Sequence, residues 1–473
     1  MPSLSTARAG GSEVRPLLEQ AGLASQAAAE WLAGWPDLRG DYRLDAAASS
    51  HFWISGASLL ARLPPKPKRS PTEAAAAGSI LRATRDLRDR FLTTHVDALY
   101  RALTRDCASF VRVEQLAYDA AAAIPGLVPT PAQVAAENEL PQRDKEGLEI
   151  DQGIFLSRVL AHPTAGAHLC HAMLLPTAAA LARLEEFRAH AALELGAATV
   201  ERRGAAAVVT MRNPRFLNAE DESTVDAVEA AVDLAILDPE SEIAVLRGGE
   251  VEHAKYRGRR VFSTGINLTH LYYGKISYLW YVKREMGFVN KLFRGLAKPE
   301  ASPDEIGGDS IEKPWIAGVD AFAIGGGCQY LLATDYVVAA SDAYLTLPAR
   351  KEGIIPGAAN LRLTRFVGDR LARQLIMYGR RLECDSPEGR LICDEIVPPR
   401  DVDAAIDRVV EGFTSSGVVS AAGNRRAFRV AQEPLDLFRR YMAVYAREQA
   451  YCHFSPALIA NLERNWSAQQ RRA

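Results

Sequence analysis

The hydrophobic periodicity of this chain changes at about residue 196, and that change constrains the fold more than any other feature. Before it, alanine and leucine recur with helical spacing, and alternating runs of β-branched residues are almost absent. The helical spacing is clearest at 74–103, 111–123 and 172–192. We therefore predict an all-α N-terminal domain over residues 1–195, which supports assembly and covers a pocket formed by the rest of the chain.

From Thr199 onward, β-type runs alternate with helical segments. A helix is predicted over 221–237, and the chain returns to a helical pattern over 411–473. Strands are expected at 205–211, 243–246, 315–319 and 336–339. The alternation is typical of β-α-β units and predicts an α/β layered domain over 196–410.

Length and charge exclude several classes of protein. A chain of 473 residues exceeds what one hydrophobic core normally organises, and 48% hydrophobic residues supply material for two. The net charge of −2 offers no field that would gather nucleic acid or an anionic membrane, so we expect neither as a partner. No apolar signal opens the chain, and Pro176 interrupts its longest apolar run, so we expect a cytoplasmic protein.

Cysteines and histidines offer no evident metal site. Six cysteines are scattered along the chain, which favours reduced thiols over a disulfide framework. His168 and His171 would share a helix face, but no motif for further ligands follows them. We interpret that pair as structural, and we expect neither a metal ion nor another cofactor.

The stretch 314–329 is the most informative for chemistry. It reads as a strand, a turn and three glycines, Gly325 to Gly327, that open a helix. Glycines cost backbone entropy and add no packing, so this run makes sense if backbone N–H groups must closely approach a ligand oxygen at the positive end of a helix. A second strand-to-helix turn stands at 262–268 and strengthens a signal that one glycine run would give only weakly.

These two turns, separated by an insertion rich in aromatic rings at 269–313, resemble those of the enoyl-CoA hydratase (crotonase) superfamily. The resemblance runs from about Thr199 to Val410. Its other motifs are Asn213-Pro214, Asn218-Ala219, Pro348 with 353–357, 362–368 and 393–398. It implies an α/β crotonase fold of ββα units, a coenzyme A thioester substrate, a CoA site and assembly contacts in 411–473, and a homohexamer built as a dimer of trimers.

In that superfamily two backbone amides bind the thioester oxygen and stabilise it as an enolate, and the resemblance places them at Ile266 and Gly326. Donors aimed at an oxygen that gains charge only in the transition state are worth about 3–4 kcal/mol each. Gln329 and Ala349 stand where the superfamily has its two catalytic glutamates. An amide and a methyl group cannot deliver and withdraw protons, so hydration of an enoyl-CoA is excluded.

An oxyanion hole without these glutamates, joined to a helical N-terminal half, is similar to a branch of cofactor-free dioxygenases that act on arylacetyl-CoA thioesters. This implies that 3,5-dihydroxyphenylacetyl-CoA and O2 give 3,5-dihydroxyphenylglyoxylate and CoA, in the biosynthesis of a non-proteinogenic amino acid for glycopeptide antibiotics. It further implies that Glu220 and Arg284 hydrogen-bond the two phenols. Gln329 would be a polar catalytic neighbour and Gly327 a further substrate contact.

The sequence leaves several alternatives open. Glu220 is followed by Asp221 and Glu222, which is also typical of an acidic first helical turn, and Arg284 also fits a helix surface. The aromatic insertion suits either a buried helix face or a wall beside a ligand. For the whole chain, the alternatives are a crotonase-type thioesterase or hydrolase and an inactive CoA-ester binding protein. The residues do not identify the acceptor of the α-proton, although Glu352 is a further charged candidate near the site.

Overall fold

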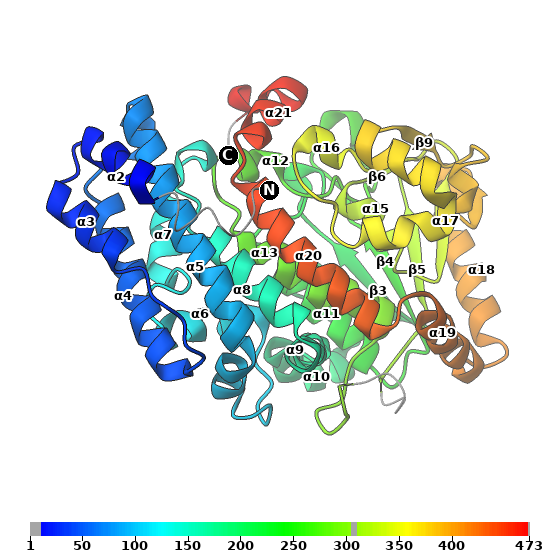
Figure 1. Ribbon diagram of the computed structural model, residues 1–473. Helices are drawn as coiled ribbons and strands as arrows, with labels where there is room; N and C mark the ends of the chain where they lie inside the picture. The colour runs from blue at the N-terminus through cyan, green and yellow to red at the C-terminus, as the bar shows by residue number, and fades with distance from the viewer. Residues whose placement is uncertain (1–10, 304–309, 472–473) are drawn as a thin grey trace.

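Helices form the N-terminal half of the protein, as the periodicity predicts. The computed structural model describes residues 11–303 and 310–471. The helices are α2 (Gly11–Gln20), α3 (Ser25–Ala33), α4 (Tyr42–Leu60), α5 (Pro71–Thr104), α6 (Val113–Ala123), α7 (Pro131–Asn138), α8 (Ile150–Ala161), α9 (Pro163–Leu174) and α10 (Ala178–His190) (Figure 1). The longest, α5, starts at a reciprocal cap in which Ser70 and Glu73 each accept the other's backbone N–H, with Pro71 at the first helical position.

The helix expected over 172–192 is wrong in its bounds. Helix α9 ends at Leu174 and α10 begins at Ala178, because Pro176 lacks an N–H and disfavours helical backbone at Leu175. The side chain of Thr177 then accepts the Ala180 N–H and caps α10. The stretch 163–190 is long and apolar enough to cross a membrane by composition, yet 56% of its most apolar window is buried inside the protein. We interpret it as a pair of core helices.

A seven-stranded sheet forms the centre of the second half. Its strands, in spatial order, are β1 (Ala192–Glu194), β2 (Ala198–Arg203), β3 (Ala206–Met211), β4 (Ile243–Gly248), β5 (Trp315–Val319), β7 (Tyr336–Ala340) and β10 (Glu395–Val397). Strands β1 to β3 are antiparallel, and the pairs from β3 to β10 are parallel. All four predicted strands are therefore confirmed. The predicted helix is α11 (Val225–Leu237), which starts later than expected because residues 221–224 form a hydrogen-bonded turn.

A smaller sheet lies beside the large one and creates the repeating unit of the fold. It contains β6 (Phe322–Ile324), β8 (Tyr344–Thr346) and β9 (Arg381–Glu383). The chain passes from β5 into β6 and α15 (Gly326–Leu331), and then from β7 into β8 and α16 (Ala349–Glu352). Each passage is a ββα unit, so the spiral of ββα units is present. Both short helices thus begin at the same side of the small sheet.

The aromatic insertion forms α12 (Leu268–Tyr272), α13 (Tyr278–Arg284), a π-helical turn (Glu285–Val289) and α14 (Asn290–Arg294). Most of its rings are buried, among them Tyr278, Trp280, Tyr281 and Phe288. Helices α6 and α8 of the N-terminal half contact α13. Helix α20 (Leu435–His453) packs along α8 and crosses in front of the sheet domain (Figure 1). The helical half therefore supports the segment that carries Arg284.

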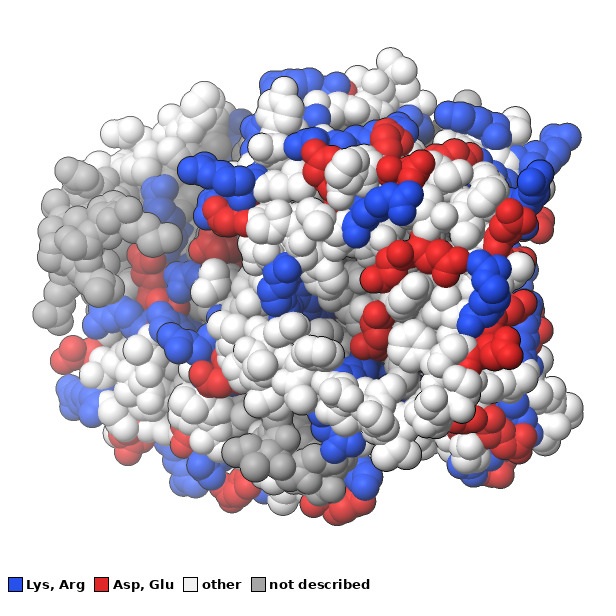
Figure 2. Space-filling view, turned by 90° about the vertical axis from the view of Figure 1, so that its right-hand side faces the viewer, with Lys and Arg blue, Asp and Glu red and all other residues white. Residues whose placement is uncertain are grey.

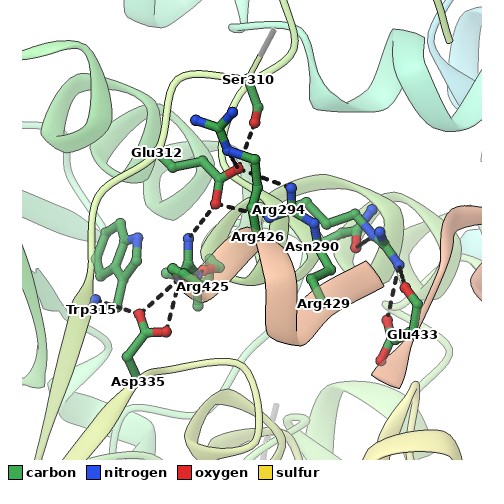
Figure 3. A network of polar contacts seen from close by, with 11 residues as sticks. Asn290, Arg294, Ser310, Glu312, Trp315, Asp335, Arg425, Arg426, Arg429 and Glu433 are labelled. Carbon is green, nitrogen blue, oxygen red and sulfur yellow. Dashed lines mark hydrogen bonds and ion pairs between the residues drawn. The ribbon is translucent and has the colours of Figure 1, made fainter. Parts of the chain in front are cut away.

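The remaining C-terminal helices are α17 (Ala359–Arg373), α18 (Val402–Thr414), α19 (Val419–Gln432) and α21 (Pro456–Trp466). A network of buried charges fixes α19 to the sheet (Figure 3). Arg429 donates two hydrogen bonds, of 2.8 and 2.9 Å, to the Glu312 carboxylate, and Arg425 Nε donates one of 2.9 Å to Asp335. Asp335 also accepts the backbone N–H of Trp315 at 2.8 Å, so the network reaches strand β5. Pairing of this kind is what makes buried charges tolerable.

The surface carries mixed charge. On the face shown in Figure 2, groups of lysine and arginine lie interspersed with groups of aspartate and glutamate between larger uncharged areas. Exposed ion pairs, such as Arg259 with Asp342 at 2.7 and 2.5 Å, also combine the two signs of charge. The distribution agrees with the small net charge of the chain.

Candidate active site

Two glycine turns meet at the edge of the small sheet. Gly265 has φ of +72° and Gly325 has φ of +54° with ψ of −113°, backbone conformations that side chains rarely permit. A Cβ added to Gly265 would lie only 2.7 Å from the Gly326 nitrogen, so the two turns are in contact. Within the described residues, the N–H groups of Ile266 and Gly326 have no hydrogen-bond acceptor. They are two adjacent donors available to a ligand oxygen.

Glu220 holds one of these turns in place through its backbone. Its N–H donates to Gly265 O at 2.8 Å, and its carbonyl accepts the Asn267 N–H at 2.7 Å. These two bonds form an isolated parallel bridge between Glu220 and Ile266. Glu220 lies before α11 and is 6% exposed, so it does not belong to a solvated first helical turn. Its carboxylate points to the interior beside the two amides.

Arg284 lies at the centre of a buried polar cluster and is 3% exposed, so the interpretation as a surface helix residue is wrong. Its Nε donates to Glu220 Oε2, and Nη2 donates to Glu220 Oε1 at 3.3 Å. Nη1 donates to Glu285 Oε1 and, at 2.8 Å, to Gln329 Oε1. Nη2 also donates to the Gly326 carbonyl at 3.2 Å. The five N–H groups of the guanidinium are all used, so Arg284 positions its neighbours and has no donor left for a ligand.

Glu285 was not among the residues predicted to form the site. It shares Arg284 with Glu220, and its second oxygen accepts the Ala358 N–H at 3.0 Å. Glu285 opens the π-helical turn, whose irregular geometry directs it and Arg284 inward together. In the sequence, the only signal was a basic and an acidic residue in adjacent positions, which is more typical of a helix surface.

A small inner cavity of about 30 Å³ lies against the two amides and the cluster. Its lining is Glu220, Ile266, Trp280, Tyr281, Arg284, Gly325, Gly326, Gln329, Ala349, Glu352, Ile354, Ile355, Pro356, Gly357 and Tyr445. The structure thus brings five of the six predicted site residues to one cavity. The sixth, Gly327, packs against Ser263, where an added Cβ would lie 2.9 Å from the Ser263 carbonyl oxygen.

The aromatic insertion forms one wall of this cavity. Trp280 and Tyr281 both contribute to the lining, so the insertion is at once a buried helix face and a wall beside the cavity. The Trp280 indole N–H is buried and, among the described residues, has no acceptor. Tyr445 of α20 lies on the same lining. The lining therefore combines aromatic and apolar side chains with a few polar groups, a composition typical of sites for aromatic ligands with polar substituents.

An outer groove of about 420 Å³ lies next to the inner cavity. Ile266 and Glu352 line both spaces, so they stand at the neck between them. Arg215, Lys351 and Arg471 place positive charge along the groove. Its rings are Phe216, Tyr344 and Trp466. This combination suits a long, flexible ligand that carries phosphates and a base.

Comparisons with known proteins identify several relatives of this chain. The family description "Enoyl-CoA hydratase/isomerase" matches residues 305–436. The (3,5-dihydroxyphenyl)acetyl-CoA 1,2-dioxygenase of Amycolatopsis orientalis is 48% identical over 393 residues, which cover 83% of this chain and 89% of the relative. The short-chain-enoyl-CoA hydratase of Clostridium acetobutylicum is 27% identical over 237 residues, 50% of this chain and 82% of the relative. A solved enoyl-CoA hydratase from Mycobacterium avium subsp. paratuberculosis K-10 has a TM-score of 0.47 at 21% identity and covers 59% of this chain and 98% of its own.

Proposed function

This chain belongs to the enoyl-CoA hydratase/isomerase (crotonase) family, and from that premise we propose that it is a dioxygenase that acts on 3,5-dihydroxyphenylacetyl-CoA. The products are 3,5-dihydroxyphenylglyoxylate and CoA, made for a non-proteinogenic amino acid of a glycopeptide antibiotic. One observation carries the proposal. The N–H groups of Ile266 and Gly326 lie on the lining of a cavity in which Gln329 and Ala349 stand where hydration needs two acids.

The chemistry needs no metal or flavin in this proposal. Loss of an α-proton gives a carbanion that the thioester and the aromatic ring both delocalise, and the amides of Ile266 and Gly326 hold the enolate oxygen. Such a carbanion is electron-rich enough to pass one electron to O2, and recombination forms a peroxide at the α-carbon. Attack of that peroxide on the thioester carbonyl expels CoA. Cleavage of the O–O bond with loss of the second α-proton then leaves the keto acid, so both atoms of O2 stay in the product.

The polar cluster supports binding of the ring. The Glu220 carboxylate accepts a phenol O–H, and the Gln329 amide nitrogen, for which the described residues offer no acceptor, donates to the other phenol oxygen. Arg284 acts through these two groups, because its own N–H groups are occupied. The outer groove takes the CoA, with Arg215, Lys351 and Arg471 near the phosphates.

The first prediction tests the reaction itself. Protein freed of metal by a chelator and supplied with 3,5-dihydroxyphenylacetyl-CoA should consume one O2 for each CoA released, at the rate of untreated protein. An oxygen electrode and a thiol assay measure the two quantities. Release of CoA without O2 consumption would show a thioesterase. Loss of activity on chelation that iron or copper restores would contradict a cofactor-free reaction.

A second prediction tests the place of Gln329. In Gln329→Glu, a third carboxylate joins Glu220 and Glu285 around one guanidinium, so it adds uncompensated negative charge beside the enolate. We expect slower O2 consumption, with a deficit that shrinks towards low pH as that carboxylate is protonated. Gln329→Ala removes one hydrogen bond, worth about 1 kcal/mol, without adding charge, and should be milder at neutral pH. Equal rates for Gln329→Glu and wild type across the pH range would remove Gln329 from the site.

A further inference from the structure

One carboxylate at the cavity has no partner. Glu352, the last residue of α16, is 8% exposed and lines the neck between the inner cavity and the outer groove. In the part of the chain that the structure describes, its carboxylate makes no hydrogen bond and no ion pair. A buried carboxylate without a partner lowers the stability of the fold. Such a residue in a cavity therefore indicates a role in binding or catalysis.

The other ionisable groups on the cavity wall are unsuited to accept a proton. Glu220 is held in a buried ion pair with Arg284, which also pairs with Glu285 outside the lining. Burial raises the pKa of the Tyr281 and Tyr445 hydroxyls well above their ordinary value, so both stay neutral. Glu352 is the remaining carboxylate on the described lining.

Burial also gives Glu352 the right basicity. With no charged group compensating, desolvation raises the pKa of its carboxyl to about 7. A base with a pKa near the working pH is both available in its ionised form and strong enough to attract a proton. By contrast, an exposed glutamate is ionised at neutral pH but is a weak base.

The position on α16 brings this carboxylate to the boundary between the cavity and the groove. Ala349, at the site of one lost family acid, begins the same helix three residues earlier, so Glu352 is displaced by about one helical turn. Ile266, whose amide faces the thioester oxygen, is the other residue shared by the cavity and the groove. A thioester with its ring inside and its CoA outside must pass this neck. Its α-carbon, which is bonded to the carbonyl carbon, then lies on the side of the neck that faces the inner cavity.

We propose that Glu352 is the base that takes the α-protons of the thioester, an assignment that rests on the proposed dioxygenase function. In the first step a Glu352 oxygen bonds to the α-proton, the C–H electron pair becomes the enolate double bond, and the carbonyl π pair moves to the oxygen held by Ile266 and Gly326. Protonated Glu352 then gives its proton to the departing CoA thiolate. The regenerated carboxylate takes the second α-proton when the O–O bond breaks.

The test separates proton removal from the reaction with oxygen. Without O2, wild type in D2O should exchange the α-hydrogens of 3,5-dihydroxyphenylacetyl-CoA for deuterium, followed by mass spectrometry. Glu352→Gln, close to isosteric, should bind the thioester within about 3-fold of wild type but exchange at least about 100-fold more slowly, the usual worth of a general base. Glu352→Asp keeps a carboxylate at a shorter reach and should fall between the two.

Glu149→Gln is the matched control. Glu149 is fully buried, burial raises the pKa of its carboxyl to about 7 as well, and its Oε2 has no partner among the described residues, but it lies outside the cavity lining. Its variant should exchange deuterium within about 3-fold of wild type. A thermal melt at pH 8 gives a second measurement. If Glu352 only stabilised the fold, its replacement would lower the melting temperature. Glu352→Gln removes a buried charge, so its melting temperature should equal or exceed that of wild type.

The outcomes are distinguishable. Exchange by Glu352→Gln or Glu352→Asp at the wild-type rate would overturn the assignment while O2 consumption by wild type upholds the proposed function. Exchange by wild type without O2 consumption in air would overturn the dioxygenase, and the comparison of variants would still decide whether Glu352 is the base. Absence of exchange in wild type would overturn both.

Discussion

Replacing Arg284 with alanine should cost about 3–5 kcal/mol of unfolding free energy and almost all O2 consumption. The substitution leaves Glu220 and Glu285 buried without a countercharge and removes a donor from Gln329 and from the Gly326 carbonyl. Urea denaturation measures the stability and an oxygen electrode the rate.

Arg158→Ala is the control for this substitution. Arg158 pairs with Asp89 at 2.6 Å, but the two side chains are 30% and 23% exposed and lie outside the cavity. Loss of such a pair should cost no more than about 1 kcal/mol and leave O2 consumption unchanged. Similar losses for both variants would mean that the Arg284 cluster is solvated and does not organise the site.

The longer helices and strands were predictable because the hydrophobic pattern of each extends over enough residues to be recognised. Helix α5 has 34 residues with a capping sequence at its start, and β3 and β5 are runs of apolar residues bounded by turns. The small sheet was not predictable in the same way. Strands β6, β8 and β9 have three residues each, too few to show alternation. They pair because the tertiary fold brings them side by side, which no local pattern predicts.

The residues of the candidate site also differ in whether the sequence could predict them. Ile266, Gly326 and Gln329 lie in the two glycine turns, whose motifs carry the resemblance to the crotonase superfamily, and that resemblance implied their roles. The roles of Glu285 and Glu352 depend on burial and on which groups lie opposite, and neither quantity is visible in a run of residues. Arg284 illustrates the limit: the family resemblance implied that it binds a phenol, but its contacts use every donor.

Gly326→Ala should lower O2 consumption by about 10²–10³-fold, the effect of losing one oxyanion donor. The added Cβ would overlap Glu220 Oε1 and lie 2.7 Å from Arg284 Nη2. Both atoms belong to a buried ion pair that cannot retreat without breaking, so the backbone must move and redirect the amide. Overpacking of this kind also costs about 1–3 kcal/mol of stability. Steady-state kinetics should show the loss mainly in kcat, because the amide acts on charge that develops in the transition state.

Gly78→Ala makes the same chemical change where the protein has room. Gly78 lies inside α5, and an added Cβ there meets no atom within 4 Å. Alanine in a helix interior is favoured over glycine by about 0.5–1 kcal/mol, so this variant should be slightly more stable than wild type with an unchanged rate. Comparison of the two variants separates the effect of the close contacts at Gly326 from the general effect of replacing glycine with alanine. A wild-type kcat for Gly326→Ala would mean that its N–H does not face the enolate oxygen, and the two turns would then have only a structural role.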